Sequence, residues 1–96
     1  MYNTAYGMVK TITDGIKDAH MQYEMAMEAW EEKHHDCARL HAEEAENRLQ
    51  GVKRWWEKLR NIPAEHEDPV RIALLDGYKH WLESVERKLM EFRSHM

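Results

Sequence analysis

The sequence is poor in residues that interrupt helices or cross-link a chain. Among 96 residues there are 4 glycines, 2 prolines and 1 cysteine. So few turn-forming residues exclude a many-stranded β-sandwich, in which turn signals recur every ~8–12 residues. The single cysteine, Cys37, excludes an intrachain disulfide. Because residues 1–10 also lack an apolar signal core, a cytoplasmic location is expected.

Long hydrophobic runs are missing as well. No segment approaches the ~18 apolar residues of a membrane-spanning helix, so no membrane association is expected. The net charge of −4 argues against non-specific binding to nucleic acid or anionic lipid. With 43% hydrophobic and 33% charged residues, the composition is that of one globular domain spanning residues 1–96.

The apolar residues that are present follow helical periodicity. In the first third of the chain they recur at alternating steps of four and three, which places them on one stripe of a helix and excludes a strand. Gly7 and Gly15 each lower helix propensity there by ~1 kcal/mol. The stripe comprises Ala5, Val9, Ile12, Ile16, Ala19, Tyr23, Ala26 and Trp30.

A second stripe repeats this spacing in a shifted phase. Its members are Ala38, Ala42, Ala45, Leu49, Val52, Trp56 and Leu59. The phase changes across residues 33–36, where Asp36 is a good N-cap because its carboxylate can accept from free backbone N–H groups. This pattern predicts a tight turn and an antiparallel helical hairpin. The alternative is one continuous helix with a stutter at residues 33–36.

Proline places the remaining boundaries. Pro63 disfavours helical geometry in the residue before it, so the second helix is expected to stop by Asn61. Asp68 and Pro69 then form a typical helix start, and a third helix should run to about Arg93. Its apolar set is wider than one stripe and comprises Ile72, Leu74, Leu75, Tyr78, Trp81, Leu82, Val85, Leu89, Met90 and Phe92.

The predicted fold is therefore all-α, an antiparallel three-helix bundle made of a hairpin and a third long helix. Several large apolar residues lie outside the first two stripes, namely Met8, Met21, Met25, Met27, Leu40 and Trp55. Surplus apolar area in a small domain indicates a partner. We expect a homodimer that completes the bundle by burying the third helix.

Charge is distributed unevenly along the hairpin. Residues 14–46 contain ten acidic and three basic side chains, whereas residues 47–60 contain one acidic and five basic ones. The basic end also carries an aromatic residue outside the stripe, and Trp with Arg is a favoured combination in protein interfaces. We predict a protein-binding surface at Lys53, Arg54, Trp55 and Lys58, with Trp81 and Leu82 from the third helix. The same basic end would suit an accessory nucleic-acid-binding protein.

Potential metal ligands gather at the predicted turn. His34, Cys37 and His41 fall within eight residues, and Glu44 follows one turn after His41. Imidazole and thiolate are ligands for zinc, nickel or copper. However, the segment contains no Cys-x-x-Cys or His-Glu-x-x-His motif, so a polar turn is the simpler interpretation and no cofactor is expected.

Residues 18–52 resemble the helical hairpin of ferritin-like and rubrerythrin-like proteins. The similarity lies in the segments Tyr23-Glu24-Met25-Ala26-Met27-Glu28-Ala29 and Leu40-His41-Ala42-Glu43-Glu44-Ala45-Glu46. The resemblance implies a metal-binding four-helix bundle formed by a dimer. The family's second helix carries Glu-x-x-His, whereas this chain has Glu44-x-x-Asn47.

No catalytic arrangement stands out, because the chain has neither a phosphate-binding glycine loop nor a serine elbow. The sequence therefore predicts a non-catalytic, self-associating helical protein that binds another protein. The metal-binding bundle and the accessory nucleic-acid-binding protein remain the alternatives.

Overall fold

A computed structural model describes the backbone of residues 4–61 and 69–96, with side chains described for residues 9–61 and 75–96. It contains three helices: α1 (Thr4–Glu31), α2 (His35–Arg60) and α3 (Pro69–Ser94). The part of the chain that is described contains no strand, which confirms the all-α prediction. The predicted roles of Asp68 and of the side chains of Ala5, Met8, Ile72 and Leu74 lie outside the described residues.

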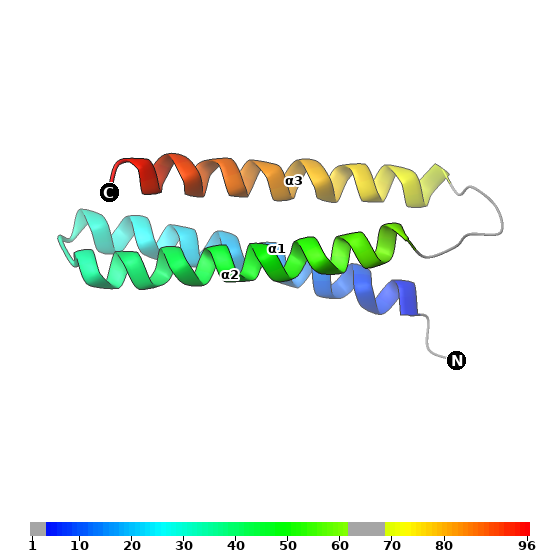
Figure 1. The fold of residues 1–96 in the computed structure, drawn as a ribbon, viewed down its shortest axis with the longest axis horizontal. Helices are drawn as coiled ribbons and strands as arrows, with labels where there is room; N and C mark the ends of the chain where they lie inside the picture. Colours follow the sequence, from blue (N-terminus) through cyan, green and yellow to red (C-terminus); the bar gives the residue numbers. More distant parts are fainter. Residues whose placement is uncertain (1–3, 62–68) are drawn as a thin grey trace.

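The three helices run side by side with alternating direction. Figure 1 shows α2 antiparallel to α1, and α3 lying along one side of this pair in the same direction as α1. The bundle is elongated, with principal extents of 53 × 24 × 15 Å. Within the described residues, no helix combines the length and the apolarity needed to cross a lipid bilayer.

The turn between α1 and α2 confirms the hairpin and excludes the continuous helix. Lys33 has a φ of 65°, the left-handed conformation that often ends a helix. The His34 N–H donates to the Ala29 carbonyl at 2.8 Å, and the Lys33 N–H donates to the Trp30 carbonyl at 3.0 Å. This pair of bonds is a Schellman motif, here with lysine at the position that usually holds glycine.

The prediction that Asp36 caps the second helix is wrong. The N-cap is His34, and no side chain donates or accepts a capping bond there. Asp36 lies in the first turn of α2, where its negative charge still interacts favourably with the helix dipole. At the other end, Arg60 is the last residue of α2 and Asn61 is its C-cap, as the position of Pro63 predicts.

The predicted apolar stripes form the core. The described stripe residues are buried or partly buried. The buried face of α3 is narrower than its apolar set in the sequence predicts, because Met90 belongs to that set but is 66% exposed. The buried core residues are Ile12, Ile16, Ala19, Ala26, Ala38, Ala42, Ala45, Leu49, Val52, Leu59, Leu82, Val85 and Leu89.

Small side chains bring α1 and α2 close together. A Cβ atom built on Gly15 would lie 2.4 Å from Cγ2 of Val52, so the Val52 side chain packs against the α1 backbone at a distance that leaves no room for a larger residue at position 15. Polar contacts flank this seam: a hydrogen bond of 2.8 Å joins Nδ1 of His41 to Oε1 of Gln22. Arg48 lies 3.6 Å from the Asp18 carboxylate. These contacts fix the antiparallel register of the hairpin.

Aromatic, hydrogen-bonding and apolar contacts join α3 to the other two helices. Phe92 packs edge-on against Tyr23 and Trp30, with ring centroids 6.1 and 6.3 Å apart. A hydrogen bond of 3.1 Å joins the hydroxyls of Thr13 and Tyr78. Because Leu82, Val85 and Leu89 are buried against the other two helices, the main apolar face of α3 is already covered within one chain. This face is thus covered without the second copy that the sequence led us to expect, and dimerisation itself stays a prediction.

Candidate interaction surface

The C-terminal end of α2 presents two adjacent tryptophans in different directions. Consecutive helical residues differ by about 100° around the axis. Trp56 therefore turns toward α3 and donates its indole N–H to the Leu75 carbonyl at 3.2 Å. Trp55 turns outward and is 37% exposed. Nζ of Lys58 lies 4.8 Å from the centroid of the Trp55 ring, a cation–π contact that orients the ring.

The predicted protein-binding residues do not form one surface. Arg54, Trp55 and Lys58 are exposed together on the end of α2. Lys53 instead forms an ion pair with Glu86 of α3. Leu82 is 6% exposed and belongs to the core, and Trp81 is partly buried against that core. Three residues of the predicted set, Arg54, Trp55 and Lys58, are therefore exposed and unburied by α3, while the Lys53 side chain is 40% exposed but paired with Glu86.

The uneven charge survives in the folded hairpin. The turn end carries the acidic segment and the other end of α2 carries the basic one, because the two helices are antiparallel. Helix α3 supplies opposite charges on both sides of the middle of α2, where Arg93 pairs with Glu46 and Glu86 pairs with Lys53. Exposed pairs of this kind contribute at most about 1 kcal/mol each.

The predicted metal ligands are not brought together. His41 is hydrogen-bonded to Gln22, and Glu44 forms an ion pair with Arg48 at 3.0 Å. His34 lies 3.8 Å from Glu32, and Cys37 is exposed. Among residues 9–61 and 75–96, no three His, Cys, Asp or Glu side chains are grouped in a way that could hold a metal ion. The described geometry therefore gives no support to a ligand set made of His34, Cys37, His41 and Glu44.

Large apolar side chains are exposed outside the core. Their exposed fractions are 52% for Met21, 40% for Met25, 65% for Leu40, 37% for Trp55 and 66% for Met90. Four of these five are among the surplus residues that sequence spacing identifies, and Met90 is the exception. Met90 shares the apolar set of α3 in sequence, but its direction around the helix differs from that of the buried Leu89 by about 100°.

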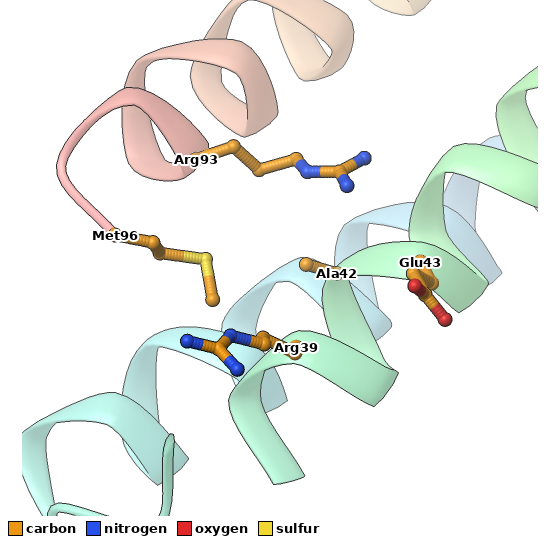
Figure 2. Close-up of a pocket in the computed structure, with 5 residues that line it drawn as sticks. All are labelled: Arg39, Ala42, Glu43, Arg93 and Met96. Carbon is orange, nitrogen blue, oxygen red and sulfur yellow. The ribbon is translucent and has the colours of Figure 1, made fainter. Parts of the chain in front are cut away.

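A shallow hollow lies where the C-terminal end of α3 meets the start of α2. It has a volume of about 270 Å³ and is lined by Arg39, Ala42, Glu43, Arg93 and Met96. Figure 2 shows Arg93 reaching over this hollow from α3 and Arg39 entering it from α2, with Met96 beside them. Sequence patterns give no sign of this hollow, because Arg39 and Arg93 are 54 positions apart and line it together only through the register of α2 and α3.

Comparison of the chain with protein-family models, with curated proteins and with solved structures finds no match. The class that the fold defines is a three-helix bundle with an exposed apolar and basic surface on its hairpin. Functional inference for this chain therefore depends on its own geometry.

Proposed function

We propose that this chain is a non-catalytic helical protein that self-associates and binds another protein. The observation that carries this proposal is the exposure of Met21, Met25, Leu40 and Trp55 on a hairpin whose core is already filled. Isolated apolar residues on a surface are ordinary, whereas grouped ones favour association.

Two of these exposed apolar residues, Met25 and Leu40, lie near the turn end of the hairpin. Gln22 of α1 and His41 of α2 are in contact at 2.8 Å. Met25 follows Gln22 by three residues and Leu40 directly precedes His41, so Met25 and Leu40 lie at nearly the same level of the antiparallel pair. Burial of such side chains contributes roughly 25 cal/mol for each Å² removed from water. A partner surface that covers both residues would therefore be stabilised.

Self-association is tested by sedimentation equilibrium of the intact chain over a wide range of concentrations. We expect an average mass that rises above the monomer value of 11.6 kDa as concentration increases. The physical reason is that association removes exposed apolar side chains such as Leu40 from water. A mass that stays at the monomer value at every concentration would contradict the proposal.

Binding of another protein is assigned to the exposed group Arg54, Trp55 and Lys58. Aromatic residues and arginine are enriched among residues that dominate interface energies. We expect affinity capture with the intact chain to recover a specific partner that a Trp55→Ala bait fails to recover. Met90→Ala is the matched control, since Met90 is exposed on a different helix. Recovery of the same proteins by the wild-type and Trp55→Ala baits would remove the assignment to this surface.

A further inference from the structure

One side of α2 carries exposed residues toward both ends of the helix. We define the α2 outer stripe as Asp36, Leu40, Glu43, Arg54, Trp55 and Lys58, all of which are exposed. Leu40 and Lys58 are 18 residues apart, which is five full helical turns, so they share one direction. Leu40 precedes the buried Ala42 by two residues, or about 200°, so the stripe faces away from the core.

The stripe is divided into halves of opposite charge. Its first half carries Asp36 and Glu43, and its second half carries Arg54 and Lys58. Each half also contains one large exposed apolar residue, Leu40 in the acidic half and Trp55 in the basic half. A surface whose two halves are complementary to each other is suited to pairing with a second copy of itself in the opposite direction.

The spacing of these residues is nearly symmetric about the middle of α2. Leu40 lies eight residues before Arg48 and Trp55 lies seven residues after it. At a rise of about 1.5 Å per residue, each is ~11 Å from a point between Asn47 and Arg48. Asp36 and Lys58 are also nearly equidistant from that point, whereas Glu43 and Arg54 lie ~7 and ~10 Å from it, a mismatch that long side chains can span. A two-fold axis placed there would bring each residue opposite its complement.

We propose that a second copy of this chain docks on the α2 outer stripe, antiparallel to the first and related to it by that two-fold axis. This inference rests on the proposed self-association and names the surface that performs it. Because Arg54, Trp55 and Lys58 also form the surface assigned to another protein, the second copy and that protein would compete for these residues. In the dimer, Leu40 packs against Trp55 of the second copy. Asp36 and Glu43 face Lys58 and Arg54 of the second copy. A parallel arrangement would place like charges together, which is unfavourable.

The centre of the stripe has room for a close neighbour. A Cβ atom on Gly51 would have nothing within 4 Å. Helix backbones approach closely where such small residues occur. Gly51 lies three residues from Arg48, close to the inferred axis.

The proposal is tested with two charge-reversed variants of the full chain. One is Arg54→Glu with Lys58→Glu, which makes the stripe acidic throughout. The other is Asp36→Lys with Glu43→Lys, which makes it basic throughout. We expect the dimer dissociation constant of each variant alone to rise about 100-fold, because every reversed contact occurs twice. Mixing the two variants in equal amounts should restore a dimer, now between an acidic and a basic stripe.

Lys79→Glu with Arg87→Glu provides the matched control. It changes net charge by the same amount on the exposed surface of α3 and should leave the dissociation constant within about threefold of the wild-type value. Helix content, measured by circular dichroism, should be the same in all variants, because every altered residue is exposed.

The results of these experiments distinguish a failure of the proposed self-association from a failure of the α2 outer stripe as its surface. A wild-type chain that stays monomeric overturns both the proposed self-association and this inference. A wild-type dimer whose stability is unchanged in both charge-reversed variants leaves self-association in place and overturns the α2 outer stripe.

Oxidative cross-linking measures the direction of the two copies. Asn47→Cys combined with Cys37→Ala should form a covalent dimer, since residue 47 meets its own copy near the axis. The wild-type chain should not, because its two Cys37 residues would be ~30 Å apart. Cross-linking through Cys37 and none through residue 47 would overturn the antiparallel arrangement.

Discussion

Leu49→Ala is expected to lower the free energy of unfolding by about 2–5 kcal/mol. Leu49 is 2% exposed and lies in the middle of α2, in contact with the shared core of the three helices. Removing its branched end costs the transfer free energy of the lost atoms and leaves a cavity that flanking helices can fill only in part. Since a domain of this size has about 5–15 kcal/mol of stability in total, the loss should be plain in urea-induced unfolding followed by circular dichroism.

The same substitution at Leu40 is the control for this prediction. Leu40 lies on the same helix but is 65% exposed. Leu40→Ala should change the free energy of unfolding by no more than about 0.5 kcal/mol when measured at concentrations low enough for the chain to be monomeric. Equal losses for the two variants would mean that the core does not lie on the side of α2 that the structure indicates.

Gly15→Ala should destabilise the protein although alanine is the better helix former. The new methyl group would lie 2.4 Å from Cγ2 of Val52, which is itself buried and stiff at χ1. Forcing the helices apart or moving Val52 costs about 1–3 kcal/mol, against a gain in helix propensity of about 1 kcal/mol. We expect a net loss of up to about 2 kcal/mol in thermal or urea unfolding.

Two further variants identify the cause of that loss. A Cβ on Gly77 of α3 would have nothing within 4 Å, so Gly77→Ala should stabilise the protein by about 0.5–1 kcal/mol. In a Val52→Ala background, where the clashing methyl group is absent, Gly15→Ala should behave like Gly77→Ala. If Gly15→Ala stabilises the wild-type protein, the close approach of α1 and α2 at this level is incorrect.

The candidate surface was only partly predictable from sequence. Spacing alone separates Leu40 and Trp55 from the apolar stripe of α2, and the structure exposes both. Spacing cannot decide which apolar residues of α3 are buried by the other two helices. For this reason Leu82 is predicted from sequence to bind a partner, whereas the structure places it in the core. Similarly, Lys53 of the basic end forms an ion pair with Glu86, a residue 33 positions away. Such pairs depend on how α2 and α3 are aligned along each other, and the residues next to each partner in the sequence do not reveal this alignment.

The sequence by itself determined the three helices, their boundaries near Asn61 and Pro69, and the two stripes that meet in the hairpin. These features are local, because a helix has a fixed period and proline acts on its immediate neighbours. Only the tertiary structure decided the cap of α2, the need for glycine at position 15 and the partners of the charged residues. Each of these depends on atoms from segments distant in sequence, or on a backbone conformation that the residue type does not favour, as at Lys33.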